Sequence, residues 1–148
     1  MSHTHTNLLV HIVFSTHGHL PLITSAIKDE LFAYMGGLLK ELKGKPIIIN
    51  GMNDHVHLLI LLPPNVSASD AMRFVKANSS RWVSEKFETK FAWQRGFGAF
   101  SVSRPNVDAV AKYIKNQEEH HKGFDFKTEF VSLLDKNDVE YDERYLWD

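Results

Sequence analysis

The sequence contains no cysteine, which excludes a disulfide scaffold and any zinc site with cysteine ligands. It also lacks an apolar run long enough to span a membrane, since the longest, residues 56–64, is interrupted by His57. The first residues carry no basic segment ahead of an apolar stretch, so they do not predict a signal peptide. We therefore expect a cytoplasmic protein without a membrane partner. Its 148 residues suit one domain with its own core.

The chain has almost no net charge, but its charges are unevenly distributed. The total is -1, with 17 basic and 18 acidic residues. Residues 61–115 hold 9 basic and 4 acidic side chains, a net of +5, whereas residues 116–148 hold 4 and 10, a net of -6. Because local charge decides what a surface attracts, the basic middle is compatible with nucleic acid and also with an ordinary solvated surface.

Hydrophobic periodicity and turn residues predict an α+β fold. Short apolar runs between turn residues indicate strands, and apolar residues at helical spacing indicate helices. The expected order is β-α-β-β-α-β-α plus a C-terminal helix, the ferredoxin-like or RRM-like split βαβ arrangement with an antiparallel sheet. The expected strands are 7–15, 46–50, 55–62 and 97–103, the expected helices are 25–43, 67–87, 107–121 and 126–136, and residues from about 124 to 148 form an acidic C-terminal tail.

Two histidines at the start of the third expected strand are the strongest candidates for chemistry. His55 and His57 are separated by one residue, so they project from the same face of a strand. Two imidazoles on a rigid platform suit a metal ion. The chain has 9 histidines and two further His-x-His pairs, so the pair alone favours two satisfied core histidines over metal ligands.

A second candidate group lies in the helix expected over 107–121. Tyr113 and Gln117 stand at i and i+4 and therefore share one face of a helix. Alone, this pair would be a tyrosine at the edge of the core and a glutamine in solvent. His120 and His121 follow one turn later and could assist a metal ion or a proton transfer, although histidines near the C-terminus of a helix often only complement its dipole.

The combination and order of these motifs resemble the single-tyrosine HUH transposases of the insertion-sequence-200-like kind. The resemblance covers nearly the whole chain and implies a single HUH transposase domain over residues 1–148. The segments that carry it are His55-Val56-His57 after Asn53-Asp54, residues 76–80, Trp93-Gln94, residues 96–102, Tyr113-Ile114 with Gln117-Glu118, and residues 140–147.

This resemblance implies an enzyme that cleaves and rejoins single-stranded DNA. It implies that Tyr113 is the nucleophile and forms a 5′-phosphotyrosine intermediate, and that His55, His57 and Gln117 hold a divalent metal, Mg²⁺ or Mn²⁺. The substrate would be single-stranded DNA with a hairpin near the transposon ends. A metal ion would polarise the phosphate and neutralise its charge. A tyrosine of ordinary pKa is mostly protonated at about pH 7, so it needs the field of the metal or a base in order to attack.

The resemblance also implies a homodimer in which the Tyr113 helix of one subunit completes the His55 and His57 site of the other. The first expected strand has little charge and many large apolar residues, so as an unpaired edge it would be prone to aggregation, and a partner subunit would cover it.

The candidates for DNA contact outside this site are Arg73, Lys76, Arg95 and Arg104, each of which could equally be a solvated surface charge. An alternative function is an RNA- or single-strand-binding module without catalysis, because residues 95–100 resemble an RNP1 motif. RNP1 requires two aromatics on one face of a strand, whereas Phe97 and Phe100 are three residues apart and face opposite ways. A metal-dependent hydrolase without a covalent intermediate is a further alternative, and it would not need Tyr113.

Overall fold

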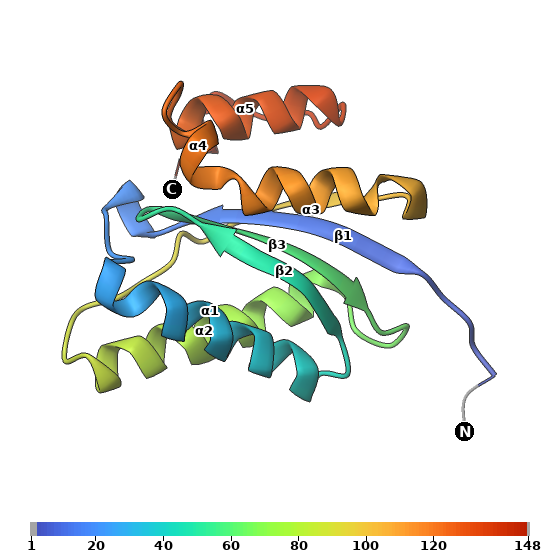
Figure 1. Ribbon diagram of the computed structural model, residues 1–148, viewed down its shortest axis with the longest axis horizontal. Helices are drawn as coiled ribbons and strands as arrows, with labels where there is room; N and C mark the ends of the chain where they lie inside the picture. Colours follow the sequence, from blue (N-terminus) through green and yellow to red (C-terminus); the bar gives the residue numbers. More distant parts are fainter. Residues whose placement is uncertain (1–2, 148) are drawn as a thin grey trace.

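The computed structural model describes residues 3–147, which form a four-stranded antiparallel sheet between two layers of helices (Figure 1). The strand order β2-β3-β1-β4 is that of the predicted split βαβ arrangement, so the fold class is confirmed. The strands are β1 (Leu8–Ser15), β2 (Lys45–Gly51), β3 (His55–Leu62) and β4 (Gly98–Ser101), and the helices are α1 (Ser25–Glu41), α2 (Ala68–Lys86), α3 (Val107–Lys115), α4 (Gln117–His120) and α5 (Phe126–Lys136), with short 3-10 turns at His17–His19, Arg104–Asn106 and Glu143–Tyr145.

Strand β1 lies inside the sheet, as the predicted split βαβ order requires, and so is not an unpaired edge that a partner subunit would cover. It pairs with β3 from Leu8↔Leu62 to Ser15↔His55, and on its other side it pairs with β4. The edges are β2 and β4. An apolar strand suits the centre of a sheet as well as a dimer edge, so its composition could not decide between them. The composition of this strand therefore gives no support for a dimer interface along it.

The lower layer in Figure 1, α1 and α2, covers the face of the sheet that carries the main hydrophobic core. Helix α2 begins as predicted, because the Ser67 side chain accepts a hydrogen bond from the Asp70 backbone N–H at 3.0 Å. Helix α1 begins at Ser25, the first residue of the expected helix, and its N-cap is Thr24. The apolar sides of both helices pack on alternate residues of β3, including Val56 and Leu58.

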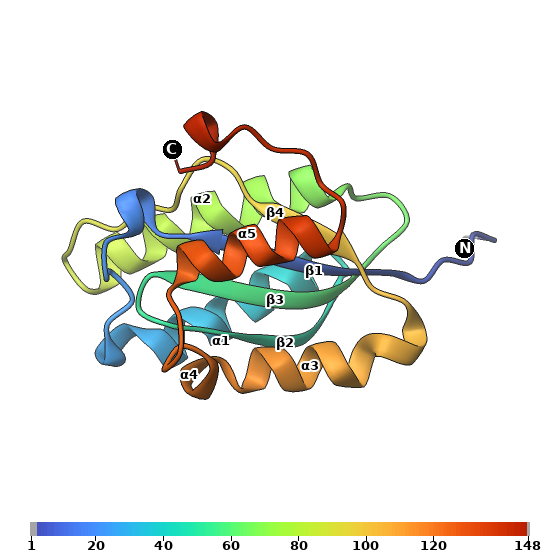
Figure 2. The ribbon, with the colours of Figure 1, turned by 90° about the horizontal axis from the view of Figure 1, so that it is seen from above.

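The upper layer, α3, α4 and α5, covers the opposite face (Figure 2). A second core there joins Val13 of β1 and Phe100 of β4 to Phe126, Phe130 and Leu134 of α5. Helix α5 has the bounds predicted from the sequence and is packed on the sheet, so the segment from 124 onward is not wholly a tail. The helix expected over residues 107–121 is interrupted at Asn116, between α3 and α4.

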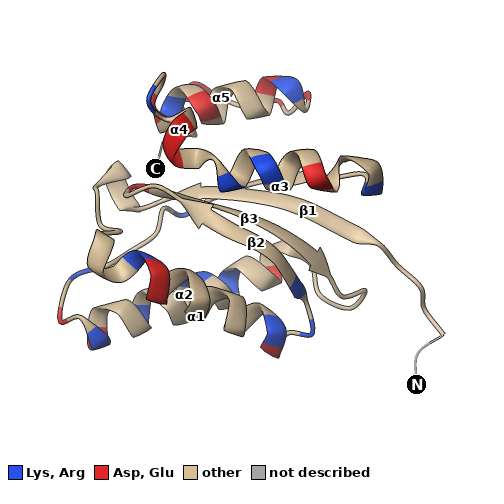
Figure 3. Cartoon of the chain, in the orientation of Figure 1, with Lys and Arg blue, Asp and Glu red and all other residues tan. Residues whose placement is uncertain are grey.

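Most charged side chains lie on the helices and loops around the sheet, as Figure 3 shows. Within residues 3–147, no helix is long and apolar enough to cross a membrane.

The docking of α5 on the sheet depends on the absence of a side chain at Gly98. A Cβ at this position would lie 2.8 Å from the Phe130 ring and 3.1 Å from the Phe100 ring. We expect Gly98→Ala to lower the free energy of unfolding by about 1–3 kcal/mol, as overpacking does. Urea denaturation measures this change. Gly96→Ala, which meets no atom within 4 Å, is the matched control and should stay within about 0.5 kcal/mol of the original. Equal effects of the two substitutions would contradict this packing account.

Candidate active site

His55 and His57 project from the central strand β3 toward the layer of α3 and α5. Both side chains are fully buried, and their ring centroids lie 5.2 Å apart. The alternation of a strand places both on one face, as the sequence predicted. Val56 between them faces the main core on the other side. The pair is therefore held on a rigid platform at the centre of the fold.

Each of these imidazoles is anchored through its Nδ1 atom. His55 Nδ1 donates to Asp54 Oδ1 at 2.7 Å, and His57 Nδ1 is hydrogen-bonded to His11 Nε2 at 2.8 Å. His11 comes from β1 and is buried beside His57, with the two rings stacked. These partners fix the orientation of both rings and leave both Nε2 atoms pointing toward α3, α4 and α5.

Gln117 reaches the pair from the first residue of α4. Asn50 of β2 donates its side-chain N–H groups to the carbonyls of Ile114 and Lys115 at 3.0 and 3.1 Å, which ties the end of α3 to the sheet. The Gln117 side chain is fully buried, and its Oε1 accepts a hydrogen bond from His55 Nε2 at 2.9 Å. The interruption at Asn116 therefore does not prevent Gln117 from meeting the histidines.

Glu129 of α5 occupies the centre of this group. Its side chain is 1% exposed. Its Oε1 lies 3.1 Å from His57 Nε2, 3.3 Å from His55 Nε2 and 3.0 Å from His121 Nε2. Its Oε2 accepts a hydrogen bond from Gln117 Nε2 at 3.1 Å. One carboxylate thus joins three imidazoles and an amide.

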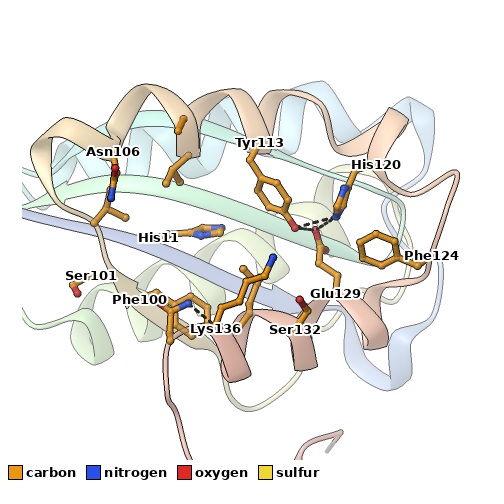
Figure 4. Close-up of a pocket in the computed structure, with 15 residues that line it drawn as sticks. His11, Phe100, Ser101, Asn106, Tyr113, His120, Phe124, Glu129, Ser132 and Lys136 are labelled. Carbon is orange, nitrogen blue, oxygen red and sulfur yellow. Dashed lines mark hydrogen bonds and ion pairs between the residues drawn. The ribbon is translucent and has the colours of Figure 1, made fainter.

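The hydroxyl of Tyr113 lies on the other side of the same carboxylate. Tyr113 stands on α3, is half-buried, and donates its hydroxyl proton in a hydrogen bond to Glu129 Oε2 (Figure 4). His120 Nε2 lies 3.2 Å from the hydroxyl oxygen. The Tyr113 ring meets the His57 ring edge-on, with centroids 5.8 Å apart. All four predicted site residues, His55, His57, Tyr113 and Gln117, therefore come together within one chain.

The contacts of Glu129 control the protonation of the cluster. Burial alone would lower the pKa of His55, but hydrogen bonds to Asp54, Glu129 and Gln117 outweigh it and raise the pKa to about 9. Burial lowers the pKa of His57, and it lowers that of His11 to about 3, so these two rings are neutral. Burial would raise the pKa of Glu129, but hydrogen bonds from His55 and His57 hold it well below its usual range. The cluster therefore contains a carboxylate beside an imidazolium.

Tyr113 is not ionised in this arrangement. Burial raises its pKa, and the hydrogen bond to the negative Glu129 raises it further. The phenol therefore keeps its proton, and that proton already points at an acceptor.

A cavity of about 310 Å³ is lined on one side by Tyr113 and Glu129 (Figure 4). It lies between α3 and α5 above strands β1 and β4. Apolar and polar residues both line its wall, with Phe100, Val110 and Leu133 among the apolar ones. The polar residues that line it include Asn106, His120, Ser132, Lys136 and Asn137.

The four predicted DNA-contact residues lie outside this cluster. Arg73 and Lys76 belong to α2, on the opposite face of the sheet from the histidines. Arg73 is exposed and pairs with Asp70, whereas Lys76 is half-buried and donates to the Gln94 carbonyl at 3.0 Å. Lys76 therefore holds the loop before β4 and does not lie on an open solvated face. Contact of these residues with DNA stays a prediction, as it does for Arg95 and Arg104, which are exposed in loops flanking β4.

Sequence reasoning missed His11 and Glu129. His11 stands in an otherwise apolar strand, on the face of that strand that points toward α5. From the sequence alone it is interpreted only as part of the strand. Glu129 stands on the apolar side of α5, between Phe126 and Phe130, which is an unusual place for a charge. That position was the available signal.

The comparisons with known proteins agree with this geometry. The model of the family described as "Transposase IS200 like" matches residues 4–117. The transposase for insertion sequence element IS200 of Salmonella typhimurium strain LT2 is 31% identical over 133 residues, covering 82% of this chain and 84% of that protein. The corresponding Salmonella typhi transposase matches equally well. This chain belongs to the IS200-like transposase family.

Two solved structures share the fold. A candidate transposase from Deinococcus radiodurans R1 is similar with a TM-score of 0.65 at 19% identity, covering 79% of this chain and 95% of that one. A REP-associated tyrosine transposase bound to a REP hairpin is similar with a TM-score of 0.61 at 14% identity, covering 82% and 74%.

The anchoring of His55 by Asp54 can be measured directly. In metal-free protein, we expect Asp54→Asn to lower the pKa of His55 from about 9 toward 6.5, because the strongest hydrogen bond to the charged ring loses its negative partner. A histidine whose pKa is higher in the folded than in the unfolded state stabilises the folded state fully at any pH below its unfolded pKa. This stabilisation is lost as the pH rises through the pKa of the folded state. The unfolding free energy should therefore fall between about pH 6.5 and 9, and fall less in the variant. An NMR titration of His55 and urea unfolding check both statements.

The control is Asp29→Asn, which changes an exposed carboxylate on α1. An unchanged His55 titration in Asp54→Asn would show that Asp54 does not anchor the ring.

Proposed function

We propose that this transposase cleaves and rejoins single-stranded DNA through a covalent bond between Tyr113 and a 5′-phosphate. The observation that carries the proposal is the shared carboxylate of Glu129. It contacts the Nε2 atoms of His55 and His57 on one side and the Tyr113 hydroxyl on the other. A nucleophile beside a base and a cluster of metal-binding donors is an arrangement that supports tyrosine-based phosphoryl transfer.

The donors fit a divalent cation. Both strand imidazoles have Nδ1 held by a partner and Nε2 aimed inward, as metal-ligating histidines do. Donor atoms of His55, His121 and Glu129 lie within 4.8 Å of one another. By family resemblance, His55, His57 and Gln117 would hold Mg²⁺ or Mn²⁺. A divalent cation bound there neutralises phosphate charge and polarises the phosphorus.

The chain's own residues would carry out the substitution at phosphorus. Tyr113 Oη forms a bond to phosphorus while the bond from phosphorus to the 3′-oxygen breaks, which leaves a 3′-hydroxyl and a 5′-phosphotyrosine. The phenol proton has Glu129 Oε2 as its acceptor, and the departing 3′-oxygen takes up a proton. A 3′-hydroxyl can later attack the same phosphorus and release Tyr113, so strands are rejoined without ATP.

A single strand suits the entrance to this site. The cavity beside Tyr113 measures about 310 Å³, at the lower end of the range for small-ligand pockets, so it accommodates a nucleotide-sized group but not a duplex. Lys136, Asn106 and Asn137 on its wall can contact phosphate oxygens. The related tyrosine transposase was solved with a REP hairpin, which supports a hairpin near the cleavage site as the substrate of this chain.

The alternative of an RNA-binding module without catalysis has less support. Phe97 packs toward the main core, whereas Phe100 lies in the second core under α5, so the two aromatics are on opposite faces of the sheet. The sheet face that an RRM leaves open for RNA is covered here by α3 and α5 (Figure 2).

The substitution Tyr113→Phe distinguishes cleavage by a covalent tyrosine intermediate from cleavage by metal-dependent hydrolysis. Loss of the hydroxyl removes the nucleophile and keeps the ring that packs on His57, so we expect no protein–DNA adduct and unchanged binding of single-stranded DNA. The assay is a denaturing gel after incubation with a single-stranded hairpin substrate and Mn²⁺. Tyr34→Phe, Tyr141→Phe and Tyr145→Phe are the controls and should keep the adduct. Continued cutting by Tyr113→Phe would instead favour the hydrolase, in which water attacks.

A mixing experiment tests how the site is assembled. The resemblance implies a homodimer with trans sites, but one chain already brings Tyr113 to its own His57, and we propose that the site is completed in cis. Tyr113→Phe and His57→Ala, each inactive alone, should then stay inactive when mixed under conditions of subunit exchange. Partial recovery of adduct formation would establish the trans site of a dimer.

A further inference from the structure

His121 is placed in the same way as the two strand histidines. Its Nδ1 donates to the Phe124 carbonyl at 2.9 Å, and its Nε2 points inward to Glu129 Oε1 at 3.0 Å and Gln117 Oε1 at 3.2 Å. Three imidazoles from two separate parts of the chain thus have an anchored Nδ1 and a converging Nε2. A histidine that only complements a helix terminus has no need of such an anchor.

The distances from Glu129 Oε1 to the three inward-facing nitrogens match those between neighbouring ligands of one metal ion. Ligands at about 2.1 Å from an ion lie about 3.0 Å apart at neighbouring octahedral positions and about 3.4 Å apart in a tetrahedron. Glu129 Oε1 lies 3.0, 3.1 and 3.3 Å from the Nε2 atoms of His121, His57 and His55. Donor atoms of His55, His121 and Glu129 also lie within 4.8 Å of one another, so these three side chains could close on one cation, which His57 would join by a larger movement.

Charge also favours Glu129 as a ligand. A buried carboxylate has a high desolvation cost, and partners of opposite charge must offset it. Imidazole and amide ligands are neutral, so Glu129 would supply the only negative charge on the cation from this group. Both Glu129 and His121 lie beyond residue 117, where the match to the family model ends.

We propose that His121 and Glu129 are additional ligands of the divalent cation, supplied by the C-terminal segment of this chain. The proposal rests on the metal site of the proposed function and extends it. Glu129 Oε1 would bind the ion while Oε2 keeps the hydrogen bond to Tyr113, so one carboxylate would join metal and nucleophile. Three imidazoles and one carboxylate favour Mn²⁺ over Mg²⁺, since imidazole nitrogen is a better ligand for a transition metal.

Metal titration of the purified full chain tests this assignment without reference to cleavage. Isothermal titration calorimetry with Mn²⁺ would compare the original protein with Glu129→Gln, His121→Gln and His57→Ala. Loss of a partner that only orients a ligand costs about 10–100-fold in affinity, so loss of the ligand Glu129 should cost about 100-fold or more. His121→Gln should cost at least about tenfold. Mg²⁺ should bind the original protein more weakly than Mn²⁺.

Two exposed residues provide matched controls. Glu119→Gln changes a carboxylate on α4 that pairs only with Lys122 in the described part of the chain, and His17→Gln changes an exposed imidazole after β1. Both should bind Mn²⁺ like the original protein. Circular dichroism would establish that each variant is folded. If Glu129→Gln does not fold, His121→Gln still decides whether the C-terminal segment supplies a ligand.

The results distinguish this inference from the proposed function. If His57→Ala no longer binds Mn²⁺ while Glu129→Gln and His121→Gln bind it normally, the metal site of the proposed function is supported and the two additional ligands are refuted. Glu129 would then only fill, in the free protein, the position that a substrate phosphate takes. If the original protein does not bind Mn²⁺, the metal dependence of the proposed function fails as well.

Discussion

The buried carboxylate of Glu129 is the interaction on which the arrangement of the upper layer depends. A carboxylate that is 1% exposed would be strongly destabilising without compensation. Here it is met by His55, His57 and His121 and by the amide of Gln117. Each of these partners comes from an element that must be in its place before the charge is satisfied. The charge of Glu129 is therefore satisfied only when α4, α5 and the end of α3 stand in these positions over the sheet.

The fold supplies that arrangement through two cores on opposite faces of one sheet. The main core, between the sheet and helices α1 and α2, holds β3 in place and buries every second residue of this strand. The residues between them face upward, which places His55 and His57 beneath α3 and α5. The second core around Phe126 and Phe130 then holds α5 at the height where Glu129 reaches both rings. The hydrophobic packing thus positions the polar cluster, and the cluster determines the chemistry.

Local patterns predicted those parts of the protein that local physics determines. Strand alternation placed His55 and His57 on one face, and the bounds of β3 and α5 were predicted correctly. Helical spacing brought Tyr113 and Gln117 together in spite of the interruption at Asn116. That interruption was not predictable, because Asn50, 64 residues earlier in the chain, ties the end of α3 to β2. The neighbours of β1, the loop contacts of Lys76 and the roles of His11 and Glu129 likewise depend on long-range contacts, which no local pattern reports.

In the proposed site, one chain would hold a metal ion and its nucleophile through the same carboxylate. Anomalous diffraction from crystals soaked in Mn²⁺ would test this arrangement. We expect one peak among the Nε2 atoms of His55 and His57, with Glu129 Oε1 at about 2.1 Å and Tyr113 of the same chain still hydrogen-bonded to Glu129 Oε2. A peak whose tyrosine comes from another subunit, or a Glu129 side chain turned away from the ion, would contradict it.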